Sequence, residues 1–156
     1  MTSRKPTIAV IGQGDCSPDL KETAALIGRY IAEHGGVLVC GGMGGVMEGA
    51  ARGAKEAGGV TIGIIPTLRK SDANPYIDHV IATGLGDARN VIVARTADVV
   101  IALPGKYGTL SEIAYALMAG IPVISVSSWV LGDDVHQVED PLQAAQLAME
   151  LAAKRV

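Results

Sequence analysis

The chain alternates between short runs of apolar residues and longer segments in which apolar residues recur with the period of a helix. The strands expected from the apolar runs are residues 7–11, 37–40, 61–65, 80–82, 99–103 and 122–126. These runs are almost entirely apolar, which is typical of strands buried on both faces of a parallel sheet. The pattern predicts one α/β domain over residues 1–156, a single doubly wound, Rossmann-like parallel sheet with helices on both faces.

Helices are expected in the segments between these strands. Ser17 followed by Pro18 has the character of an N-cap and a first helical residue, and Gly35 ends the helix that they begin. The other expected helices follow the glycine run at 41–45, lie near 88–96 and at 108–119, and close the chain at 141–154. The polar segments 67–75 and 127–140 are expected to be irregular.

Composition argues against several classes of protein. The net charge is −3 and phenylalanine is absent, so the chain lacks the basic surface and stacking aromatics of a nucleic-acid-binding protein. No apolar run approaches the roughly 20 residues that span a bilayer, and the N-terminus lacks the apolar segment of a signal peptide. We therefore expect a cytoplasmic protein without a membrane partner. Cys16 and Cys40 form no metal-binding or disulfide pattern, so no metal site is predicted.

Three glycine-containing loops follow expected strands, and each of them opens a helix: 12–17, 41–45 and 104–109. A helix N-terminus presents unpaired amides and a partial positive charge, and glycine allows the backbone to approach an anion closely. The alternative is that these glycines serve tight turns only. The candidate ligand-binding residues in the loops are Gly12, Gly14, Gly41, Gly42, Gly44, Gly45, Pro104, Gly105, Lys106, Tyr107, Gly108 and Thr109.

The glycine loops match neither of the common nucleotide-binding fingerprints. Ser17 stands where a dinucleotide-binding loop that begins at Gly12 would need its third glycine. Tyr107 follows Gly105-Lys106 where the phosphate-binding loop of an ATPase requires serine or threonine. A dehydrogenase or an ATPase is therefore poorly supported.

Two charged residues near these loops have both a structural and a functional interpretation. Thr109 and Glu112 have the spacing of a capping box, in which Glu112 would bond to the amide of the cap residue. Glu112 would also lie close enough to the loop to contact a ligand. Arg89 would occupy the first turn of a helix capped by Asp87, where a cation opposes the helix dipole unless it binds an anion or stays solvated.

Longer motifs resemble a known superfamily over roughly residues 8–126. The segments GGMGGVMEGAARGA at 41–54 and PGKYGTLSE at 104–112 are similar to the superfamily of the cytokinin-activating LOG phosphoribohydrolases, long mislabelled as lysine decarboxylases. The ARN at 88–90, which includes Asn90, resembles the branch that contains the molybdenum cofactor carrier protein. The resemblance implies that Arg89 and Glu112 would be the catalytic pair of a hydrolase. Lys106 in place of the second glycine of PGG departs from the hydrolase pattern.

Three functions remain open at this point. The first is a carrier that holds a small phosphorylated ligand, either the molybdenum cofactor or a nucleotide. The second is a LOG-like hydrolase that cleaves nucleoside 5′-monophosphates, and the third is a nucleotide-sensing regulatory subunit. The resemblance also implies a homodimer or homotetramer, and the apolar residues expected on the helix at 108–119 agree with this.

Overall fold

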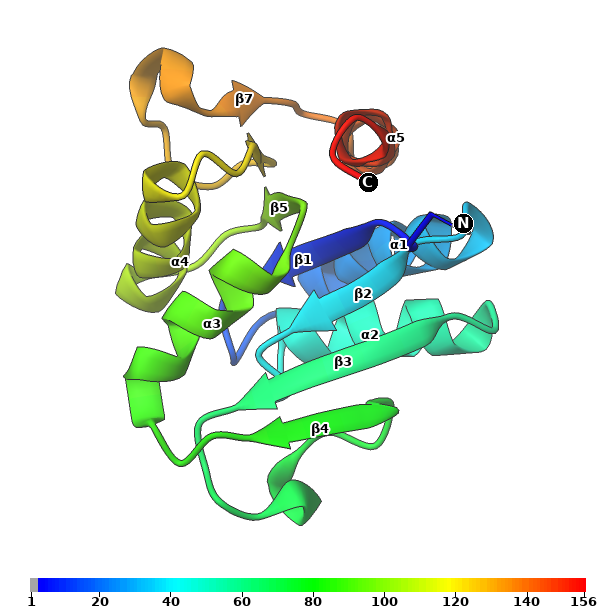
Figure 1. The fold of residues 1–156 in the computed structure, drawn as a ribbon, viewed down its shortest axis with the longest axis vertical. Helices are drawn as coiled ribbons and strands as arrows, with labels where there is room; N and C mark the ends of the chain where they lie inside the picture. The colour runs from blue at the N-terminus through cyan, green and yellow to red at the C-terminus, as the bar shows by residue number, and fades with distance from the viewer. Residues whose placement is uncertain (1–2) are drawn as a thin grey trace.

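A seven-stranded parallel sheet forms the centre of the protein in a computed structural model that describes residues 3–156 (Figure 1). The strand order across the sheet is β4-β3-β2-β1-β5-β6-β7. The strands are β1 (Thr7–Ile11), β2 (Val37–Cys40), β3 (Val60–Ile65), β4 (His79–Ala82), β5 (Val99–Ala102), β6 (Val123–Ser125) and β7 (His136–Gln137). All six strand pairs are parallel, as the unbroken apolar runs predicted.

Helices cover both faces of this sheet, which confirms the predicted α/β Rossmann-like class (Figure 1). The helices are α1 (Pro18–Glu33), α2 (Val46–Glu56), α3 (Arg89–Thr96), α4 (Tyr107–Met118) and α5 (Pro141–Ala153). Helices α1, α2 and α5 contribute to one buried cluster of aliphatic side chains, and α3 and α4 contribute to a second. The sheet therefore separates two cores, which is why its central strands are apolar at nearly every position.

Local sequence signals predicted the start of helix α1 but missed strand β7. The Ser17 side chain caps α1 by accepting a hydrogen bond from the amide of Leu20 at 3.2 Å, with Pro18 as the first helical residue. The segment 127–140, predicted to be irregular, contains a 3-10 turn at Gly132–Asp134 and the edge strand β7. That strand has two exposed polar residues, so no apolar run marks it.

Among residues 3–156, no helix is both long enough and apolar enough to cross a membrane. Helix α4, on which we expected a self-association surface, places Ile113 in the core and leaves Met118 75% exposed. Homo-oligomerisation remains a prediction.

The central strands β1 and β5 create the place where a ligand can bind. Strand β1 pairs with β2 on one side and with β5 on the other, so the chain leaves these strands toward opposite halves of the sheet. Their carboxyl ends are joined by main-chain hydrogen bonds from Leu103 to Ile11 at 2.8 Å and from Gln13 to Pro104 at 3.0 Å. In open α/β sheets the crevice beyond such a switch point is the usual ligand site.

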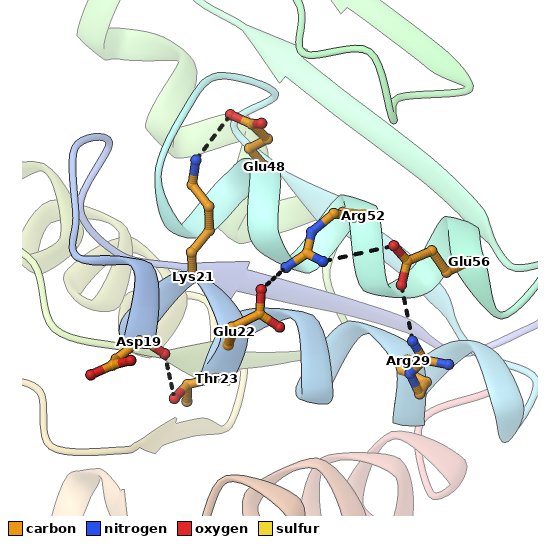
Figure 2. A network of polar contacts seen from close by, with 8 residues as sticks. All are labelled: Asp19, Lys21, Glu22, Thr23, Arg29, Glu48, Arg52 and Glu56. Atoms are coloured by element: carbon orange, nitrogen blue, oxygen red, sulfur yellow. Dashed lines mark hydrogen bonds and ion pairs between the residues drawn. The ribbon is translucent and has the colours of Figure 1, made fainter.

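Helices α1 and α2 pack unusually closely, because glycines remove the side chains between them. A Cβ added at Gly53 would lie 1.9 Å from the carbonyl oxygen of Ala25, and one added at Gly28 would lie 2.0 Å from that of Ala50. Ion pairs at the edge of this contact join Lys21 to Glu48, and Arg52 to Glu22 and Glu56 (Figure 2). The two helices therefore behave as one rigid layer under the loops that precede them.

Replacing Gly53 by alanine tests this close packing. Gly→Ala inside a helix ordinarily stabilises a protein by about 0.5–1 kcal/mol, but here the new methyl group meets backbone. We expect Gly53→Ala to lower the free energy of unfolding by about 1–3 kcal/mol in urea titrations. Arg52→Ala, which removes surface ion pairs on the same helix, should cost less than about 1 kcal/mol. A Gly53→Ala protein as stable as the wild type would contradict the observed helix contact.

Candidate ligand-binding site

A cavity of about 380 Å³ opens beyond the carboxyl end of the sheet, at the switch point between β1 and β5. Its walls come from the β1–α1 loop, the start of α2, the start of α3 with the turn before it, and the start of α4. The lining residues are Gly12, Gln13, Gly14, Asp15, Met47, Asp87, Arg89, Asn90, Lys106, Gly108, Thr109 and Glu112. The first turns of three helices thus face one space.

The structure brings together some of the residues singled out from the sequence and places others behind them. The cavity is lined by Gly12, Gly14, Arg89, Asn90, Lys106, Gly108, Thr109 and Glu112. The remaining candidates do not line it: Gly41, Gly42, Gly44, Gly45, Pro104, Gly105 and Tyr107.

The glycines at 41–45 support the cavity instead of lining it. A Cβ at Gly41 would lie 2.6 Å from the sulfur of Met47 and 2.7 Å from Nη2 of Arg89, so this glycine makes room for both cavity residues. Gly45 adopts a φ of 62°, and a Cβ there would lie 2.3 Å from the carbonyl oxygen of Gln13. The predicted glycine requirement therefore has a packing cause at these positions.

The loop before α4 is tightly packed at Gly105, whereas Tyr107, where the helix begins, is exposed. A Cβ at Gly105 would lie 2.0 Å from Oγ1 of Thr109, so only glycine fits at that position. Tyr107 is 80% exposed, and its ring centre lies 6.2 Å from that of Trp129. The indole nitrogen of Trp129 donates to the Lys106 carbonyl at 3.2 Å, which holds the loop from outside the cavity.

Helix α4 begins at Tyr107, three residues earlier than the capping-box pattern predicted. Lys106 is the N-cap residue, its side chain forms no capping bond, and the first helical hydrogen bond runs from Leu110 to the Lys106 carbonyl at 3.0 Å. The prediction that Glu112 caps the helix is therefore wrong, because Glu112 lies in the second turn. No acceptor among the described residues satisfies the amides of residues 107–109, so they are available to an anion.

Arg89 begins α3, so its predicted first-turn position is correct. The N-cap position is held by Ala88, not by Asp87, because a 3-10 turn at Gly86–Ala88 precedes the helix. The guanidinium donates to the Ile64 carbonyl at 2.9 Å and to the side-chain oxygen of Asn90. No carboxylate in residues 3–156 forms an ion pair with Arg89, so its charge is left for a ligand.

Glu112 is a buried carboxyl group at the cavity wall. The residue is 7% exposed, and its side chain forms no hydrogen bond with any described residue. Burial raises the pKa of Glu112 to about 8, and the nearby positive charge of Arg89 offsets only part of that increase. The carboxyl group is therefore mostly protonated at neutral pH and is able to donate a hydrogen bond.

Sequence reasoning missed the contribution of four lining residues. Gln13, Asp15 and Met47 were not among the candidates, and Asp87 was interpreted as a helix cap, yet all four line the cavity. No local pattern marks them, because their roles follow from three-dimensional proximity. No group of three or more histidine, cysteine, aspartate or glutamate side chains in the described chain could hold a metal ion.

The cysteines take no direct part in the cavity. Cys40 is fully buried at the end of β2, and its burial raises the pKa of the thiol to about 12. Burial also raises the pKa of Cys16. Neither thiol lines the cavity, and neither has the lowered pKa of a reactive cysteine or a metal ligand.

Comparison with known proteins agrees with the fold, and the similar proteins include molybdenum cofactor carriers and a hydrolase. The molybdenum cofactor binding protein of Rippkaea orientalis superposes with a TM-score of 0.90 at 38% identity, covering 96% of this chain and 99% of that one. The molybdenum cofactor carrier protein of Chlamydomonas reinhardtii gives 0.87 at 37% identity, covering 97% and 99%.

A hydrolase is also among the similar proteins. The cytokinin riboside 5′-monophosphate phosphoribohydrolase of Mycobacterium tuberculosis is 36% identical over 121 residues, which cover 71% of this chain and 64% of that protein. The chain thus spans less than two thirds of this relative. Residues 5–154 match the family described as SLOG cluster4, so the resemblance to LOG-like proteins is confirmed. This chain therefore belongs to the SLOG cluster4 family.

Proposed function

We propose that the chain binds a small phosphorylated ligand in the cavity beyond β1 and β5 and carries it without converting it. One observation carries the proposal: unpaired amides at the start of α4, the Lys106 side chain and the guanidinium of Arg89 all belong to the walls of one cavity. A phosphate needs several donors and a cation, and here the start of α4 supplies the amides while Lys106 and Arg89 supply positive charge.

The phosphate group would lie at the start of α4. The amides of Gly108 and Thr109 point along the helix axis toward that position, where the helix dipole adds partial positive charge. Lys106 is exposed and its ammonium group forms no bond with a described residue, so it can turn toward the ligand. Arg89 is held by Ile64 and Asn90 and needs little reorganisation to bind a second oxygen.

The molybdenum cofactor is our preferred ligand. The two similar solved structures are described as binding or carrying it, and each superposes over nearly the whole chain. The cofactor includes a phosphate group, so a protein can hold it without ligating its metal. This suits a cavity to which neither Cys16 nor Cys40 contributes.

The alternative function is hydrolysis of nucleoside 5′-monophosphates. It is supported by the M. tuberculosis relative and by the presence of Arg89 and Glu112 in one cavity. A hydrolase would use a charged carboxylate to stabilise the positive charge that develops on the sugar. Glu112 is mostly neutral near pH 7 because of its burial, so it is poorly suited to that role.

The ligand can be identified by native mass spectrometry of the protein produced in cells that make the molybdenum cofactor. We expect a bound species with the mass of a pterin phosphate. Lys106→Ala should reduce the bound fraction severalfold, because it removes one cation from the phosphate and leaves the fold intact. Lys70→Ala removes an exposed lysine outside the cavity and should leave the bound fraction unchanged. Equal loss in both variants would argue against a phosphate at Lys106.

Incubation with AMP separates the carrier from the hydrolase. We expect the wild type to release little or no ribose 5-phosphate, because a protonated Glu112 cannot stabilise a cationic transition state. The product can be measured by an enzyme-coupled assay over several hours. Rapid release by the wild type that is abolished in Glu112→Gln would reject the carrier proposal in favour of the hydrolase.

The buried carboxyl group also predicts a pH-dependent stability. Because the pKa of Glu112 is raised from 4.5 to about 8, the folded protein between these values retains a proton that the unfolded chain has released. The free energy of unfolding should therefore fall as pH rises through this window, by up to ~1.4 kcal/mol per pH unit from this group. Glu112→Gln should gain stability relative to the wild type between pH 5 and pH 8.

Urea titrations at several pH values give the measurement. Glu139→Gln changes an exposed glutamate outside the cavity and should follow the wild-type curve. Parallel curves for the wild type and Glu112→Gln would show that Glu112 is ionised throughout the range.

A further inference from the structure

Two carboxylates in the cavity are not explained by phosphate binding. Asp15 and Asp87 both line it, and neither forms a hydrogen bond through its side chain or an ion pair within residues 3–156. Each repels a phosphate that enters the cavity, so a site built for a simple anion would be weakened by them. The carboxylates therefore indicate a ligand with a second, hydrogen-bond-donating end.

The two aspartates and Lys106 come from different parts of the cavity wall, and Asp87 lies two residues before Arg89. Asp15 belongs to the β1–α1 loop and Asp87 to the turn before α3, whereas Lys106 comes from the loop after β5. Met47 lies between these groups, because its methyl carbon is 3.5 Å from the position of a Cβ on Gly14, the neighbour of Asp15, and its sulfur is 4.0 Å from Nη2 of Arg89. A thioether offers a soft, apolar surface to a flat ring.

Glu112 gives independent evidence that the cavity is completed by a ligand. Its side chain is 7% exposed, lines the same cavity and has no partner among the described residues. Its carboxyl oxygens are not among the fully enclosed unpaired atoms, so they face the cavity, where a ligand can bond to them. A ligand with both a phosphate and a polar ring system would offer bonding partners to Glu112, to Lys106 and to the two aspartates at the same time.

We infer that Asp15 and Asp87 recognise the paired N–H groups of a 2-amino-4-oxopyrimidine ring, the edge that guanine and pterins share. An ionised carboxylate is purely an acceptor and can receive two parallel N–H bonds from the ring N–H and the adjacent amino group. The corresponding edge of adenine places an unprotonated ring nitrogen beside its amino group, and that nitrogen would face the carboxylate unfavourably. The ring would lie against Met47, with its phosphate at the start of α4. This inference rests on the proposed phosphate site.

Titration calorimetry with GMP and IMP tests the inference, because these ligands differ only by the 2-amino group. The wild type should bind GMP at least about tenfold more tightly than IMP, since the lost bond involves a charged acceptor. The double variant Asp15→Asn, Asp87→Asn should bind the two nucleotides with nearly equal affinity. The control is the double variant Asp19→Asn, Asp133→Asn, which removes the same amount of charge outside the cavity. It should keep the wild-type preference for GMP over IMP.

Two further binding measurements identify which kind of molecule carries the ring and test the phosphate site separately from this inference. A 6-substituted pterin monophosphate that binds more tightly than GMP would identify the pterin as the natural source, and the reverse order would identify a guanine nucleotide. Ribose 5-phosphate should compete for the wild type and for both double variants. If it competes for none of them, the proposed phosphate site fails. A wild type without preference for GMP over IMP, or a preference unchanged in Asp15→Asn, Asp87→Asn, overturns the inference.

Discussion

The backbone of Gln13 holds the cavity together. Its amide donates to the Pro104 carbonyl and its carbonyl accepts from the Val46 amide, both at 3.0 Å. These two bonds join the loop after β1 to the loop after β5 and to the first residue of α2. The second bond requires Gly45, since any side chain there would occupy the space of the Gln13 oxygen. Three cavity walls thus depend on one peptide segment, whatever side chain position 13 carries.

The electrostatics of the cavity favour the proposed binding function over catalysis. Arg89 and Glu112 are neighbours in the walls, yet they form no ion pair, and burial favours the neutral form of the glutamate. A hydrolase gains from a carboxylate that stays charged beside the reacting sugar. A carrier gains from groups that bind firmly without activating the ligand. Under our proposal, burial of Glu112 is the feature of this chain that favours binding over hydrolysis.

The sequence predicted the layers of the fold better than the details of the site. Unbroken apolar runs predicted β1, β2, β3, β5 and β6 because both faces of these strands are covered. Strand β7 escaped prediction because its two residues are polar and exposed. This segment becomes a strand because the fold places it beside β6, with which it pairs.

Within the site, the sequence predicted glycine loops but not which glycines face the ligand. Gly41 and Gly12 look equivalent in the sequence, yet Gly41 packs behind Arg89 and Met47 while Gly12 lines the cavity. The capping-box pattern placed the start of α4 too late, because the chain turns into the helix at Lys106 without a side-chain cap. These outcomes depend on contacts between segments far apart in the chain, which local patterns do not encode.

The close contact between α1 and α2 also has a kinetic consequence. The loops that open these two helices, at 12–17 and 41–45, are attached to a layer in which backbone meets backbone at Gly28 and Gly53. Such a layer cannot slide to open or close the cavity. A ligand bound as we propose would then enter without a slow rearrangement of this wall, and its lifetime in the complex would be set by how fast its bonds to the protein break. A carrier of this design would transfer its cargo when a recipient protein competes for those bonds.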